Sequence, residues 1–135
     1  MSLSDEEREA IISFRIQKAK DTFAEAEGIA TLGYWNAVAN RLYYACFYMT
    51  SALLIRNNHA AQTHSGVIHL FGMNFIKIGL ISKEAGKFYS KLFEIRQTGD
   101  YDDLFNLSEE DVKPLIPLAN LFISELDKLI FTHLQ

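Results

Sequence analysis

The densest group of chemically versatile residues lies in one short stretch, Arg96-Gln97-Thr98-Gly99-Asp100-Tyr101. An arginine presents a planar fork of donors that suits a phosphate group. A nearby carboxylate performs acid–base work at neutral pH only where burial favours its protonated form. Arg96 and Asp100 are four residues apart, so on a helix they would also make an ordinary ion pair. The stretch therefore predicts either an anion site or a helix-end salt bridge.

Other residues that could do chemistry are sparse. The single cysteine, Cys46, lies in an apolar run and is expected to be a buried structural thiol. His59, His64 and His69 are five residues apart and would point away from one another on a helix, so no metal site is expected. His64 follows the expected helix cap Thr63, which makes it either an exposed first-turn histidine or a polar group at a partner surface. No glycine-rich phosphate loop is present, and no cofactor is expected.

Composition predicts a folded chain of ordinary type. The 135 residues are 49% hydrophobic and 22% charged, which is typical of a single domain spanning residues 1–135. The net charge of −4 would not attract nucleic acid, so such binding would need a local site. The longest central uncharged run, residues 42–55, is too short for a bilayer, and the acidic start is unlike a secretory signal. A cytoplasmic protein without a membrane contact is expected.

Hydrophobic residues recur at helical spacing, and no strand pattern appears. The expected helices begin near Ser4, Tyr34, Thr63, Ser82 and Ser108, and the expected terminators are Gly28 with Gly33, Asn57 with Asn58, Gly79 and Gly99. A loop is expected over residues 100–107, with its carboxylates solvated. Pro114 and Pro117 should interrupt the last helix because neither donates an amide hydrogen. The pattern predicts an all-α, five-helix up-and-down antiparallel bundle with its last helix kinked near the start.

The second expected helix is apolar on nearly every side, which is typical of a helix in the middle of a bundle. Its apolar surface exceeds what one neighbour would cover, so a homodimer is expected. Arg41, Tyr44 and Tyr48 share one face of this helix through steps of three and four residues, and some of them should lie near Arg96. They could form part of a site, or they could pack with satisfied polar tips.

Three segments together carry a family resemblance. They are Asn40-Arg41-Leu42-Tyr43-Tyr44-Ala45-Cys46-Phe47-Tyr48, then Thr63-His64-Ser65-Gly66-Val67, then Leu92-Phe93-Glu94-Ile95-Arg96 with Gly99-Asp100-Tyr101. In this order the segments resemble HEPN-domain proteins, and most closely the small stand-alone branch encoded beside a minimal nucleotidyltransferase. The resemblance implies a dimeric five-helix bundle in a toxin–antitoxin or defence system. Active members are metal-independent ribonucleases with a histidine four to six residues after the arginine.

This chain departs from that motif because Asp100 stands where the histidine is expected. An ordinary aspartate is ionised at neutral pH and is a poor acid. The resemblance thus implies nucleotide or RNA binding with a degenerate ribonuclease site, together with a minimal nucleotidyltransferase partner. The alternatives are a metal-independent ribonuclease that uses Arg96 and Asp100, or a non-catalytic interaction bundle.

The candidate residues follow from this resemblance. Arg96, Asp100 and Tyr101 are the candidates for catalysis, and Arg41, Tyr44 and His64 are the candidates for ligand binding. Some relatives are silenced by nucleotidylation of a tyrosine that follows the motif, which draws attention to Tyr101.

Overall fold

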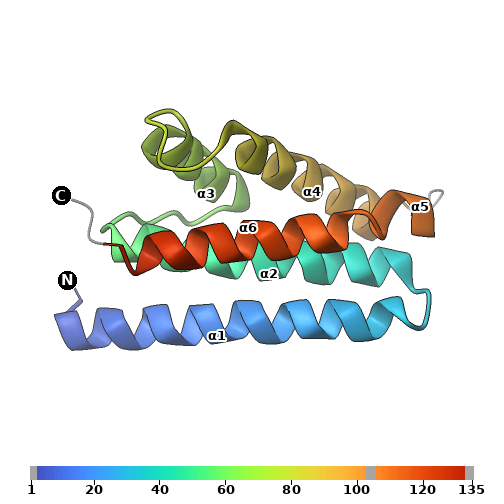
Figure 1. Ribbon diagram of the computed structural model, residues 1–135, viewed down its shortest axis with the longest axis horizontal. Coiled ribbons are helices and arrows are strands. Elements are labelled where there is room, and N and C mark those ends of the chain that lie inside the picture. The colour runs from blue at the N-terminus through green and yellow to red at the C-terminus, as the bar shows by residue number, and fades with distance from the viewer. Residues whose placement is uncertain (1–2, 103–105, 133–135) are drawn as a thin grey trace.

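The computed structural model describes residues 3–102 and 106–132, and within these ranges every regular element is a helix (Figure 1). The elements are α1 (Asp5–Ala30), α2 (Trp35–Arg56), α3 (His64–Phe71), the π-helical η1 (Gly72–Ile76), α4 (Lys83–Tyr101), α5 (Glu109–Val112) and α6 (Leu115–Ile130). The predicted all-α fold of five helices is confirmed, with α3 and η1 forming the third helix and α5 and α6 forming the fifth.

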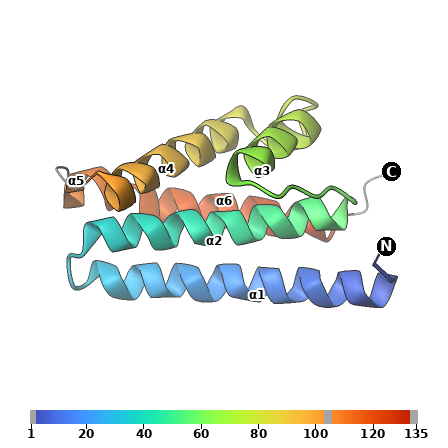
Figure 2. The same cartoon turned by 180° about the vertical axis from the view of Figure 1, so that it is seen from behind.

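The four long helices α1, α2, α4 and α6 alternate in direction along the chain (Figure 1). Helix α2 contacts α1, α4 and α6, and it also touches α3 and α5. Seen from behind, α2 lies between α1 and the layer formed by α3 and α4 (Figure 2). The central position predicted for the apolar second helix is therefore confirmed. It brings one face of α2 against the inner face of α4, where Arg96 lies.

Four of the predicted helix starts are confirmed by side-chain caps, and the helix predicted near Tyr34 begins at Trp35 without one. Ser4 and Glu7 form a reciprocal capping box at α1, and the Thr63 hydroxyl accepts a hydrogen bond from the Gly66 amide at α3. Gly28 does not end α1, which continues to Ala30, so that expectation is wrong. The turn is made by Gly33, whose φ of +78° is a conformation that glycine adopts without strain.

Helix α4 runs past Gly99 to Tyr101, so the prediction that the helix stops at Gly99 and a loop begins at Asp100 is wrong. Gly99 instead allows close packing, because a Cβ there would lie 2.9 Å from Leu107 Cδ1. The Gly99 carbonyl also accepts a hydrogen bond from Asn36 Nδ2 at 3.1 Å. The extension keeps Asp100 one helical turn beyond Arg96. The acidic residue Asp103 of the expected loop lies outside the described residues.

The last helix begins with α5, which is capped reciprocally by Ser108 and Asp111. The chain then turns, and α6 follows with a bend of 24° near its start, so the predicted kink is confirmed. Pro117 lies in the first turn of α6, where its missing amide hydrogen removes no helical hydrogen bond.

The core of the bundle contains Cys46 as a free, buried thiol, as predicted. Burial raises the pKa of the Cys46 thiol, which leaves it protonated and unreactive.

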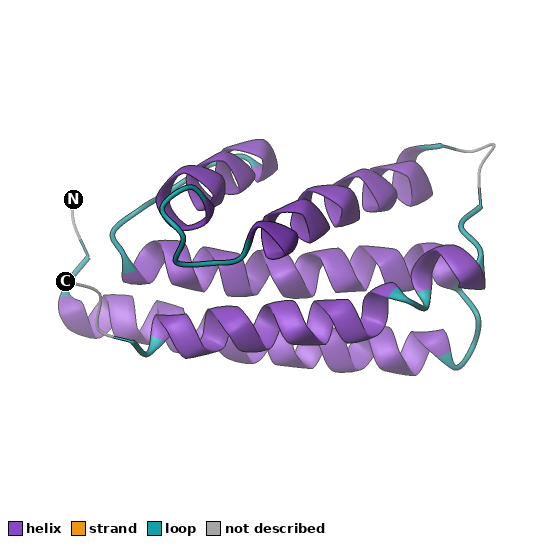
Figure 3. Ribbon diagram, turned by 45° about the horizontal axis from the view of Figure 1, so that its top comes forward, coloured by secondary structure: helices purple, strands orange, loops and turns teal. Residues whose placement is uncertain are grey.

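In the described part of the chain, no helix is long and apolar enough to cross a membrane. Helices α3 and α4 lie along one side of the group formed by α1, α2 and α6 (Figure 3).

Candidate anion site around Arg96

The Arg96 side chain is the centre of the candidate site and is only 5% exposed. Its guanidinium carbon Cζ lies 4.9 Å from the ring centroid of Tyr43, 5.4 Å from that of Tyr44, and 5.8 Å from those of Phe93 and Tyr101. We call these four rings the aromatic cage. Each such contact contributes about 0.5–2 kcal/mol, depending on desolvation. The aromatic cage thus holds the Arg96 guanidinium in place, although burial has removed most of its hydration water.

The ion pair between Arg96 and Asp100 is loose. Arg96 Nε lies 3.6 Å from Asp100 Oδ2, which is beyond hydrogen-bonding distance, and this buried Nε has no hydrogen-bond partner among the described residues. The same Oδ2 accepts a hydrogen bond from Asn40 Nδ2 at 3.0 Å. Asn40 therefore holds the carboxylate close to the arginine without letting it occupy Nε. An unpaired buried donor costs about 1–3 kcal/mol and favours an acceptor that can reach it.

Asn40 also fixes a second arginine. Its Oδ1 accepts hydrogen bonds from Arg41 Nε at 3.1 Å and Arg41 Nη2 at 2.8 Å. Arg41 is 28% exposed and its Nη1 lies 3.9 Å from Glu25 Oε2. The Tyr44 ring centroid is 5.3 Å from Arg41 Cζ and 5.4 Å from Arg96 Cζ. The structure therefore brings Arg41 and Tyr44 to Arg96, with the tyrosine ring in contact with both cations.

His64 points into the site from the first turn of α3. Its Nδ1 lies 2.7 Å from the Tyr43 hydroxyl, and its ring centroid is 4.8 Å from that of Phe47. It is half-buried, which contradicts the first of the two alternatives, an exposed first-turn histidine, whereas a role at a partner surface stays a prediction. Burial and the charge of Arg96 lower the pKa of His64, so the imidazole is neutral at pH 7. Burial raises the pKa of Tyr43 to about 12, so its hydroxyl stays protonated.

The remaining predicted residues take different positions. Tyr101 is 73% exposed and forms the outer wall of the cage. His59 packs against Phe75, with ring centroids 6.4 Å apart. Among the described residues, no three His, Cys, Asp or Glu side chains are placed to hold a metal ion.

Sequence reasoning about candidate residues missed Asn40 and Tyr43. The signal for Asn40 was its place four residues before Tyr44, on the same face of α2. Tyr43 carries the ring nearest to the Arg96 guanidinium carbon and also the hydroxyl that meets His64. Its only signal was its place in the tyrosine pair of the motif.

The structure combines the predicted all-α bundle with an arginine, Arg96, that is buried where the second and fourth helices meet. The model of the HEPN domain matches residues 12–129, and the chain belongs to the HEPN family. A "UPF0332 protein" of Thermotoga maritima is 40% identical over 92% of this chain and 94% of its own length.

Two relatives from Methanocaldococcus jannaschii carry more specific names. "Putative toxin MJ0142" is 26% identical over 87% of this chain and 80% of its own length. "Putative toxin MJ0605" is 34% identical over 72% of this chain and 71% of its own length. The crystal structure of TT1696 from Thermus thermophilus superposes with a TM-score of 0.73, covering 87% of this chain and 96% of that one, at 13% identity. This last similarity concerns the fold alone.

Proposed function

We propose that this chain is the toxin-type HEPN module of a two-protein system and that it binds a phosphate group of RNA or of a nucleotide at Arg96. Its proposed partner is a minimal nucleotidyltransferase. The observation that carries the site is the buried Nε of Arg96, which has no hydrogen-bond partner in the described part of the chain although a carboxylate lies 3.6 Å away. The family and the names of the two archaeal relatives support the toxin assignment.

Phosphate fits this site because the cage fixes the direction of the guanidinium before a ligand arrives. A rigid planar fork loses little conformational entropy when it binds an oxyanion. Arg41 adds a second positive charge beside the Tyr44 ring. The carboxylates of Asp100 and Glu25 oppose both charges, so we expect modest affinity that falls as salt is added.

The same geometry argues against rapid ribonuclease chemistry. General acid–base catalysis contributes about 10²–10⁴-fold to a rate and needs a group that exchanges protons near the reacting oxygens. Asp100 accepts a hydrogen bond from Asn40, and Nδ1 of His64 is engaged with Tyr43. We therefore propose binding with slow cleavage or none. Rapid cleavage would instead favour the metal-independent ribonuclease that uses Arg96 and Asp100.

A titration tests the proposal. The probe is a fluorescent, 5′-phosphorylated oligouridylate of about twelve nucleotides in chelator, followed by anisotropy and by gel analysis of its length. Arg96→Lys keeps the charge but loses the fork, and Arg41→Ala removes the outer cation. Each should weaken binding by about tenfold, which corresponds to 1.4 kcal/mol. Arg56→Ala serves as the control, because Arg56 lies on the same helix as Arg41 but pairs with Glu9.

Binding that is equal in all four proteins would overturn the proposed site. No binding by the wild-type protein would favour the non-catalytic interaction bundle. Each variant is first checked for an unchanged helical circular-dichroism spectrum, so that a loss of binding is not a loss of fold.

A further inference from the structure

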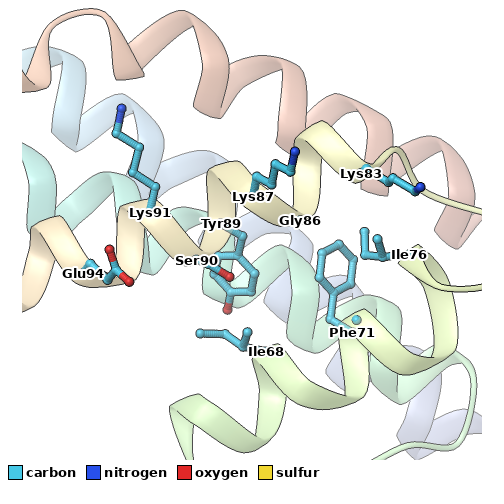
Figure 4. Close-up of a pocket in the computed structure, with 11 residues that line it drawn as sticks. Ile68, Phe71, Ile76, Lys83, Gly86, Lys87, Tyr89, Ser90, Lys91 and Glu94 are labelled. Atoms are coloured by element: carbon cyan, nitrogen blue, oxygen red, sulfur yellow. The ribbon is translucent and has the colours of Figure 1, made fainter.

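A hollow in the molecular surface lies between the third helix and α4. A groove of about 600 Å³ opens here (Figure 4). Its residues are Ile68, Phe71, Gly72, Ile76, Lys83, Gly86, Lys87, Tyr89, Ser90, Lys91 and Glu94. Lys87 and Arg96 are nine residues apart, which is half a turn out of phase on an α-helix. Lys87 and Arg96 therefore lie on opposite faces of α4.

The groove is shaped by the π-helical turn and by one close approach. At Gly86, a Cβ would lie only 3.2 Å from Ile76 Cγ1, so the missing side chain lets η1 pack closely against α4. Ile68 and Phe71 continue the apolar wall along α3. The result is an apolar channel bordered by α4 on one side and by the third helix on the other.

Three lysines follow the α4 border of this groove. Lys83, Lys87 and Lys91 are exposed, and within the described residues none of them forms an ion pair. Their four-residue spacing places them about 6 Å apart along the helix axis, over about 12 Å in all. Figure 4 shows the three lysine side chains extending outward from α4, whereas Ile68 and Phe71 lie across the groove on α3. In a chain of net charge −4, this is a local positive border.

We propose that this groove docks an acidic amphipathic helix of a partner protein. Ile68 and Ile76, the half-buried isoleucines of this groove, are eight residues apart along the third helix and would contact the apolar stripe of a docked helix, whose residues stand at positions i, i+3 or i+4, and i+7. Acidic residues beside that stripe would pair with the lysines of α4. Glu94 lies near Lys91 at one end of the groove and would repel acidic residues there. The acidic residues of the docked helix would therefore lie opposite Lys83 and Lys87, which sets the direction in which that helix runs.

The walls favour a helix over single-stranded RNA. Proteins that bind single-stranded RNA without sequence preference offer aromatic side-chain faces on which the bases stack, as well as cationic side chains. The rings at this groove do not offer such faces, because Phe71 is 1% exposed and Tyr89 is fully buried. The proposal uses no residue of the aromatic cage and stands independently of the phosphate site.

The test uses defined probes. The first is a fluorescent helical peptide of about 20 residues with leucines at the stated spacing and glutamates along one flank. The second has the same composition with the glutamates moved to the opposite flank, and the third is the oligouridylate. The wild-type protein should bind the first peptide with a Kd on the order of 10 µM and the second at least about tenfold more weakly.

Matched charge reversals complete the test. Lys87→Glu should weaken binding of the first peptide by about tenfold, whereas Lys18→Glu, an exposed lysine on α1, should change it by less than about twofold. Arg96→Lys should leave peptide binding unchanged, which separates this outcome from that of the phosphate site. Failure of the wild-type protein to bind the first peptide, equal binding of both peptides, or an RNA affinity that falls with Lys87→Glu would overturn the proposal.

Discussion

The Tyr43 hydroxyl and His64 Nδ1, 2.7 Å apart, join the centre of α2 to the first turn of α3. The ring of the same tyrosine is the one nearest to the Arg96 guanidinium carbon, at 4.9 Å. One side chain thus links the histidine of one motif to the arginine of another. The arrangement positions both groups through one side chain, and it leads to the first two predictions.

Tyr43→Phe should separate the two roles of this residue. The ring remains in the aromatic cage, so binding of the phosphorylated oligouridylate should stay within about twofold of the wild-type value. The lost hydroxyl removes one hydrogen bond at a half-buried histidine and should lower the free energy of unfolding by about 1 kcal/mol. Urea denaturation measures this loss. Tyr34→Phe, at an exposed position, is the control, and equal stability of both variants would contradict the expected role of the hydroxyl.

Stability should depend on pH through His64. Because the folded-state pKa of His64 lies below its unfolded value of 6.5, the unfolded chain binds more protons in the range between the two. The free energy of unfolding should therefore fall as the pH drops through 6.5 towards the folded-state pKa, and it should level off above about pH 7.5. His64→Gln should flatten this slope, and His69→Gln, at an exposed site, should not. An identical slope in both variants would assign the effect to other groups.

Asp100→Asn should strengthen phosphate binding. The carboxylate lies 3.6 Å from Arg96 Nε and repels an incoming anion, whereas an asparagine keeps the shape and can still meet Asn40. Removing one negative charge at this distance should tighten binding of the oligouridylate by about three- to tenfold at low salt, and by less at high salt. Glu25→Gln tests the weaker contribution of the charge near Arg41. Weaker binding by Asp100→Asn would show that the carboxylate contributes to the site.

A homodimer is expected in solution. Phe47 and Tyr48 on α2 remain half-buried in the isolated chain, which leaves aromatic surface beside the site for a second copy to cover. Light scattering should give about twice the chain mass of 15.4 kDa. Tyr48→Asp should shift the mass towards that of one chain, because a charge at an apolar interface is costly. A mass near 15.4 kDa for the wild-type protein across micromolar concentrations would contradict the expectation.

Local signals allowed much of the fold to be predicted. Capping by Ser4, Thr63 and Ser108 depends on residues within one turn, and so does the interruption at Pro114. Gly99 gave a misleading signal because it packs against Asn36, which is 63 residues away, and against Leu107, which lies beyond the end of its own helix. The π-helical turn at Gly72–Ile76 leaves no distinct mark in the hydrophobic spacing.

The candidate site was predictable only where helical spacing determines it. Arg41 and Tyr44 are three residues apart on one helix, so their proximity could be expected. The meeting of Asn40 with Asp100, and of Tyr43 with His64, depends on how α2 lies against α4 and α3. Spacing within one helix carries no information about these contacts between helices.

The most direct measurement follows the Nε–H signal of Arg96 by nuclear magnetic resonance while a nucleoside monophosphate is added. Arg56 is the internal control, because its Nε also lacks a hydrogen-bond partner among residues 3–102 and 106–132 but its guanidinium is paired with Glu9. The account predicts that the Arg96 signal moves progressively to a saturating position, while the Arg56 signal stays in place. An Arg96 signal that does not move, or that moves no more than that of Arg56, would contradict a phosphate site at Arg96.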